Sequence, residues 1–162
     1  MAELTNLESK LGEVLGLAQA AQKATKKVAS LVEDSSVKTT LEQMHEEAAE
    51  TERRATEIAS GLDGKKTAVE EKAKETRSEA EEMMSTYLGD DADGLDGLEF
   101  LTMAEAGELG HVAIVRKMNE QAGNSDVQQF VEWAIPVQQR HFEATQQAAL
   151  TLAGQEDPNE TE

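Results

Sequence analysis

The chain has 162 residues, with 33 acidic and 15 basic side chains, a formal net charge of -18 and no cysteine. This length suits one domain with one core. The negative charge excludes nucleic acids and anionic membranes as favourable partners, because they carry charge of the same sign. Without cysteine there are no disulfides, zinc-thiolate sites or thiol catalysis. No apolar run approaches the ~18 residues of a membrane span. The acidic N-terminus lacks the basic region followed by an apolar region that is typical of a signal peptide, so we expect a cytoplasmic protein.

Two long helices are predicted in the first part of the chain. Helix-forming Ala, Leu, Glu, Gln and Lys dominate the composition. Apolar residues recur every three or four positions over residues 4–32, which predicts the first helix. The second helix starts at an N-cap formed by Ser35 or Ser36 and runs to about residue 60, where Gly61 and Gly64 stop it.

Three further helices follow. A highly charged segment over about 66–88 carries only a thin apolar stripe, which is typical of a peripheral crossover helix. The acidic, glycine-containing segment 89–94 ends it. The fourth helix is expected over 95–122, and after a turn at Gly123 a fifth begins at Ser125 as its cap and runs to about 153.

The element order predicts an all-α fold. Two helical hairpins, joined by the crossover helix over 66–88, give an antiparallel four-helix bundle with one extra helix. We expect a single domain over residues 1–154 and an acidic, disordered tail over 155–162.

The last two helices place chemistry-bearing residues on their inward faces. At 100° per residue, Glu108 lies at the centre of one face, with Glu105 and His111 at its edges. On the fifth helix His141 is central and Gln138 is near the edge. Folding about the turn sets Glu108 level with His141, and His111 level with Gln138. Carboxylate and imidazole ligands of this kind suit iron, manganese or zinc.

The first hairpin offers a weaker set of candidates. Gln22 is expected at the height of the segment between His45 and Glu52. Both of these residues lie toward the inward side of the second helix, and all three histidines of the chain are therefore expected to face the interior. The alternative is that a buried Glu–His pair is a structural ion pair and no ligand. Acidic runs such as Glu46-Glu47 and Glu70-Glu71 indicate solvated faces.

These motifs resemble the ferritin-like superfamily, whose bundles carry Glu on two helices and Glu-x-x-His on the other two. Glu105 or Glu108 is similar to the third-helix ligand, and the segment 138–141 looks like the fourth-helix motif with Gln138 in place of Glu. More narrowly, the chain resembles the YciE/YciF-type ferritin-like stress proteins. That likeness is carried by His45-Glu46-Glu47, the Gly61–Lys66 connection and Ala104–Glu108. It implies a ferritin-like fold, metal or oxidative-stress handling, weak ferroxidase-type activity and a homodimer.

The leading hypothesis is a non-catalytic or weakly catalytic ferritin-like protein that binds one or two divalent metal ions, iron, manganese or zinc, in its core. The expected metal ligands are Glu105, Glu108, His111 and His141, with Gln138, His45 and Glu52 as secondary candidates. The alternative is a structural or interaction bundle whose site is degenerate and metal-free, with partners docking on an apolar stripe between the second and third helices. A hydrolase is disfavoured, because no serine or other nucleophile accompanies the carboxylates and imidazoles.

Overall fold

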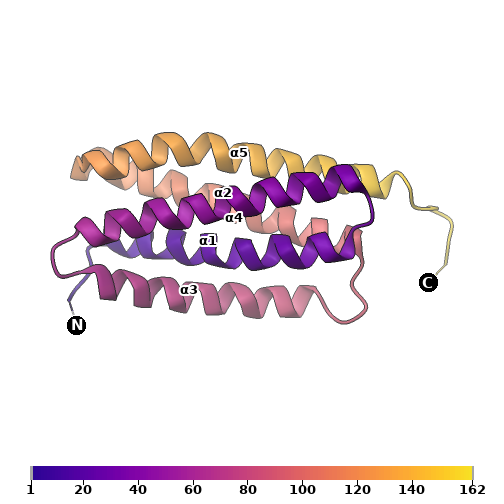
Figure 1. The fold of residues 1–162 in the computed structure, drawn as a ribbon, viewed down its shortest axis with the longest axis horizontal. Coiled ribbons are helices and arrows are strands. Elements are labelled where there is room, and N and C mark those ends of the chain that lie inside the picture. The colour runs from indigo at the N-terminus through magenta and orange to yellow at the C-terminus, as the bar shows by residue number, and fades with distance from the viewer. Residues whose placement is uncertain (1, 162) are drawn as a thin grey trace.

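A computed structural model describes residues 2–161 and has the predicted all-α architecture (Figure 1). Its helices are α1 (Asn6–Leu31), α2 (Ser35–Gly61), α3 (Lys66–Tyr87), α4 (Gly94–Ala122) and α5 (Ser125–Ala153). The observed bounds follow the predicted ones to within about two residues at each end. Within the described residues, none of the helices is long and apolar enough to cross a membrane.

The starts of α2, α4 and α5 are capped by carboxylate or amide side chains. Asp34 accepts hydrogen bonds from the backbone N–H groups at the start of α2, and Asn124 does the same for α5. The serines expected as caps, Ser35 and Ser125, are instead the first helical residues. Asp and Asn are at least as good as Ser at this position, so the cap falls one residue earlier. The predicted stop at Gly123 is confirmed, since it ends α4 with φ 66° in the left-handed region.

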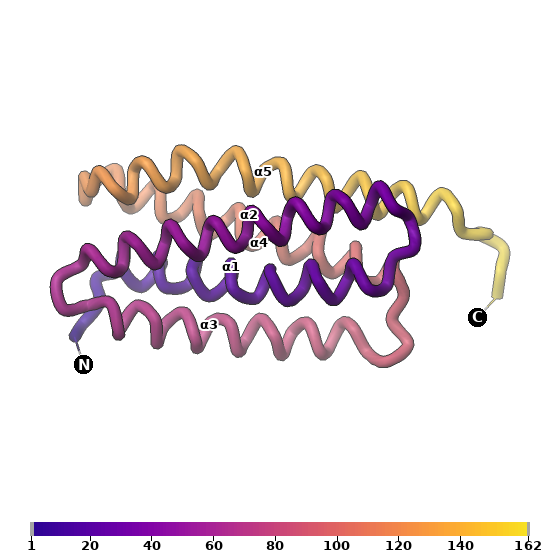
Figure 2. The backbone as a smooth tube through the Cα atoms, in the orientation of Figure 1, coloured from indigo at the N-terminus to yellow at the C-terminus, as the bar shows by residue number. Residues whose placement is uncertain are grey.

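Helix α1 lies at the centre of the molecule and packs against α2, α3 and α4, while α5 packs on α4 and α2 (Figure 2). The hairpins α1–α2 and α4–α5 therefore lie against each other, and α3 covers the outer side of α1. Two glycines let α3 come close. A Cβ added at Gly16 would lie 2.3 Å from the carbonyl oxygen of Ala73, and one at Gly12 would lie 2.9 Å from Cβ of Lys72. The crossover helix is thus an outer layer that is tightly packed at this end.

The apolar core has two halves. One half contains Leu11 and Leu15 of α1 together with Val112 of α4. The other contains Val28 of α1 and Leu101 of α4. Between these halves α4 buries Glu105 and Glu108, and α5 buries Gln138 and His141 beside Val137. The core is therefore interrupted at mid-height by a layer of hydrogen-bonding side chains.

Candidate functional site

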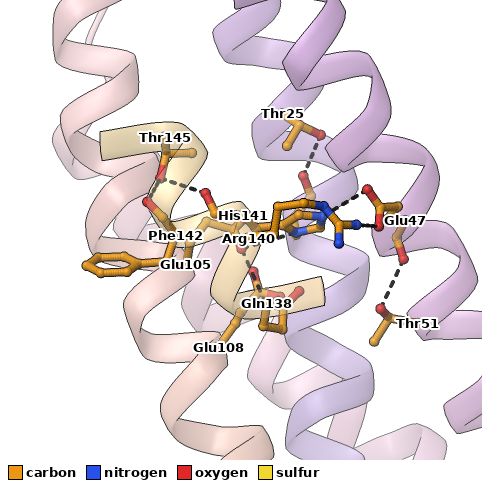
Figure 3. A network of polar contacts seen from close by, with 11 residues as sticks. Thr25, Glu47, Thr51, Glu105, Glu108, Gln138, Arg140, His141, Phe142 and Thr145 are labelled. Atoms are coloured by element: carbon orange, nitrogen blue, oxygen red, sulfur yellow. Dashed lines mark hydrogen bonds and ion pairs between the residues drawn. The ribbon is translucent and has the colours of Figure 1, made fainter. Parts of the chain in front are cut away.

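The mid-height layer, here called the polar layer, consists of Glu47 from α2, Glu105 and Glu108 from α4, and Gln138 and His141 from α5 (Figure 3). Four of these side chains are almost fully buried, with exposed fractions of 1% for Glu105, 8% for Glu108, and 2% each for Gln138 and His141. Buried polar groups of this kind destabilise a fold unless each finds a partner.

Gln138 links the two carboxylates of α4. Its amide Nε2 donates to Oε2 of Glu108 at 3.0 Å and lies 3.3 Å from Oε2 of Glu105. Burial raises the pKa of Glu108 well above its ordinary value of 4.5, and the negative charge of Glu105 raises it further, while the hydrogen bond from Gln138 acts in the opposite direction. Burial and the neighbouring carboxylate therefore favour the protonated form of Glu108.

His141 lies between two carboxylates from different helices. Its Nδ1 is 3.5 Å from Oε2 of Glu105, and its Nε2 is 3.6 Å from Oε1 of Glu47. Both Nε2 of His141 and Oε1 of Glu47 are buried without a hydrogen-bond partner among residues 2–161. The other carboxylate oxygen of Glu47 pairs with the guanidinium of Arg140.

The polar layer can balance its own charge. When His141 carries a proton, it and Arg140 supply two positive charges against the carboxylates of Glu47 and Glu105. A protonated Glu108 then leaves the layer without net charge. Proton uptake is thus one way to neutralise these buried acids, and a bound cation is the other.

The predicted pairing across α4 and α5 is wrong in two respects. Gln138 contacts Glu108, where His141 was expected, and His141 contacts Glu105. His111 lies outside the layer with 34% of its side chain exposed; its Nδ1 is 2.8 Å from the carbonyl oxygen of Gly107 and its Nε2 is 3.4 Å from Glu13. Each three-residue step along a helix falls about 60° short of a full turn. His111, two such steps after Glu105, is therefore rotated towards α1.

The first hairpin forms a separate, half-buried cluster. Gln22 lies between His45 and Glu52 as expected, since its carbonyl oxygen is 2.8 Å from Nδ1 of His45 and its amide donates to Glu52. Gln19 donates to the other oxygen of Glu52 at 3.1 Å. His45 and Glu52, two of the secondary candidates, are therefore bonded to α1. Among the three histidines, all within the described residues, His141 alone is fully buried.

Glu47 was missed by the sequence interpretation, which assigned Glu46-Glu47 to a solvated face. Glu46 is exposed, but the side chain of Glu47 is only 20% exposed and faces His141. The available signal was its position three residues after Met44 and next to Ala48, both of which are buried core residues. A polar residue at the edge of an apolar stripe can point its side chain inward when another helix places an interacting side chain beside it.

The donor set does not fit a two-metal centre. Within residues 2–161, no three or more acidic or imidazole side chains are grouped so that they could hold a metal ion. Gln138 places amide hydrogens, not a third carboxylate, against the acids of α4. Amide hydrogens repel a cation that the two carboxylates would attract.

Comparison with known proteins gives no match to a protein-family model, to a curated protein or to a solved structure.

Proposed function

We propose that this chain is a structural or interaction protein, a helical bundle in which a ferritin-like site has become degenerate and metal-free. The observation that carries the proposal is that a single amide, Nε2 of Gln138, lies within hydrogen-bonding distance of both Glu105 and Glu108. In the ferritin-like pattern the position of Gln138 is occupied by a glutamate, and the glutamates of the bundle bind metal ions together. Here an amide donor and a proton on Glu108 take over the task of neutralising them.

In this proposal the polar layer sets the register of the two hairpins. Buried acids are tolerated only where their partners are within reach. Sliding α5 by one turn along α4 would separate Gln138 and His141 from the acids of α4 that they contact. Buried polar groups fix register in this way in some helical assemblies. The layer then contributes specificity of packing and supplies no reaction.

Metal loading tests this proposal. Protein purified without an affinity tag is incubated with Fe(II), Mn(II) or Zn(II), freed of excess ion, and analysed for bound metal. We expect no stoichiometric metal on the wild-type chain. The variant Gln138→Glu restores Glu-x-x-His with His141 and should gain metal, while Gln139→Glu, which adds the same charge at an exposed position, should not.

One result would overturn the proposal. Stoichiometric metal on the wild-type chain that is lost in Glu105→Gln or Glu108→Gln would place a working metal site in the polar layer. The original hypothesis of a metal-binding ferritin-like protein would then replace the degenerate one.

A single-ion site is the second candidate function. It is favoured by the two unpartnered buried atoms, Nε2 of His141 and Oε1 of Glu47, which lie 3.6 Å apart. A divalent ion such as Zn(II) could be bound by both, with Glu105 supporting the imidazole through its other nitrogen. The guanidinium of Arg140 on Glu47 opposes this by charge. Binding of one Zn(II) that is lost in Glu47→Gln but kept in Glu46→Gln would support it.

A further inference from the structure

An apolar groove runs between α3 and α4, with α1 as its floor. Its volume is about 240 Å³. Two of its lining side chains, Met83 and Met103, are 50% and 40% exposed. The ring of Tyr87, 57% exposed, lies 6.0 Å from that of Phe100, which also lines the groove. Smaller residues form much of the remaining lining, among them Ala20, Ala24, Ala80, Ala104 and Gly107. Exposed methionines around a small-residue floor are suited to an apolar side chain from outside.

Two glycines on α4 pack against no other part of the chain that the structure describes. Gly107 and Gly110 lie in the interior of α4, where glycine is less favourable than any residue except proline. A Cβ added at either position would meet no atom within 4 Å. Gly12 and Gly16 differ, because there the backbone and side chains of α3 fill the space. Glycine at 107 and 110 is therefore suited to the close approach of a backbone that the chain itself does not supply.

Two exposed glutamates lie near the methionines of the groove, while Glu81, which lines it, is paired with Lys23 at 3.2 Å. Glu79 precedes Met83 by four residues on α3, and Glu99 precedes Met103 by four residues on α4, so each lies one turn away on the same side of its helix. Both glutamates are exposed. A second copy of this chain, with a net charge of -18, would bring like charges to the same place. Charge complementarity favours a basic partner.

We propose that this groove binds an amphipathic helix of another protein, with its apolar side chains in the groove and flanking Lys or Arg residues facing Glu79 and Glu99. The lining residues on α4 extend from Phe100 to His111, roughly 16 Å at 1.5 Å per residue, which matches about three turns of an incoming helix. The inference rests on the proposed role as an interaction protein and names its partner class. The docking surface expected from the sequence is a stripe between α2 and α3, whereas the groove lies between α3 and α4.

The experiment uses fluorescently labelled peptides and the full chain. One peptide is an 18-residue amphipathic helix of Leu and Lys, a second replaces every Lys by Glu, and a third scrambles the Leu/Lys order. We expect the Leu/Lys helix to bind at least tenfold more tightly than either control peptide. Gly107→Leu should weaken that binding at least tenfold, while Gln146→Leu, at an exposed position on α5, should leave it within twofold.

Several outcomes would overturn the inference. Equal binding of the scrambled peptide, or unchanged binding to Gly107→Leu, would reduce the effect to general charge attraction. A wild-type dimer in sedimentation that becomes monomeric in Gly107→Leu would identify a second copy as the occupant, and binding of palmitate but no peptide would identify an acyl ligand. If the peptides do not bind and the wild-type core binds no metal, the groove proposal fails but the proposed function stands. If the wild-type core binds metal, the proposed function fails, whether or not the peptides bind.

Discussion

Glu47 of α2 and His141 of α5 face each other inside the bundle, with Oε1 and Nε2 3.6 Å apart and neither atom hydrogen-bonded in the part of the chain that the structure describes. Because Glu105 lies against the opposite nitrogen of the ring, a protonated His141 would join α2, α4 and α5 at one point. The imidazole therefore contacts carboxylates of both hairpins, beside the ion pair between Arg140 of α5 and Glu47 of α2.

Removal of this imidazole should destabilise the fold. In His141→Ala the buried side chain of Glu105 loses the imidazole that lies 3.5 Å from it, and we expect the free energy of unfolding to fall by about 3–5 kcal/mol. Urea unfolding followed by circular dichroism measures it. The double variant with Glu105→Ala should lose less than the sum of the single losses, by about 1–3 kcal/mol. Strictly additive losses would show that the two side chains do not interact, and Glu143→Ala, at an exposed position, is the control.

Glu108 should make stability depend on pH. Since its pKa in the folded chain lies above 4.5, the folded chain keeps a proton that the unfolded chain releases as pH rises past 4.5. The stabilising contribution of this proton is full below that pH and is lost as pH rises towards the raised pKa. In Glu108→Gln the side chain stays neutral, and its amide oxygen can still accept from Gln138.

Unfolding measured from pH 4.5 to neutrality tests this behaviour. We expect stability of the wild-type chain to decline relative to Glu108→Gln by about 1.4 kcal/mol for each pH unit below the raised pKa. All other residues are the same in the two proteins, so the difference between the two curves reports on residue 108. Parallel curves would mean that Glu108 is ionised in the fold throughout this range.

Helix positions were predictable because they follow from local rules. Apolar spacing, Gly123 in the left-handed region and the acidic break before α4 are each read within a few residues of sequence. The inward placement of Glu105, Glu108 and His141 also followed from helical periodicity. These features depend on the angle of a residue around its own helix, which the sequence states directly.

Partner choice within the core was harder to predict. Whether His141 meets Glu105 or Glu108 depends on an axial shift of one turn between α4 and α5, and sequence spacing from the turn does not resolve that shift. Glu47 shows the same limit, because its inward turn depends on His141 and Arg140, which follow it by more than 90 residues. Local sequence patterns therefore predict which residues face inward, but they do not predict which side chains of different helices contact one another.

Asn119 should be a strong contributor to the α4–α5 turn. Its buried side chain donates to the carbonyl oxygen of Asn124 at 2.9 Å and accepts from the backbone N–H of the same residue at 3.1 Å. Asn119→Ala leaves both backbone groups without this partner, and we expect a loss of about 1–3 kcal/mol in the free energy of unfolding. Gln121→Ala, at an exposed site on the same turn of α4, should change it little. Equal values for the two variants would contradict the prediction.

The same substitution at two helix-interior glycines should act in opposite directions. In Gly16→Ala the new Cβ meets the carbonyl oxygen of Ala73 at 2.3 Å, so α3 must move away from α1 and we expect a loss of about 1–3 kcal/mol. In Gly107→Ala the new Cβ meets nothing, and the better helix former should add about 0.5–1 kcal/mol. Thermal and urea unfolding of both variants measure the pair. Destabilisation by Gly107→Ala would show that this glycine is needed for the stability of the chain. It would then no longer support the proposal that another helix packs on this surface.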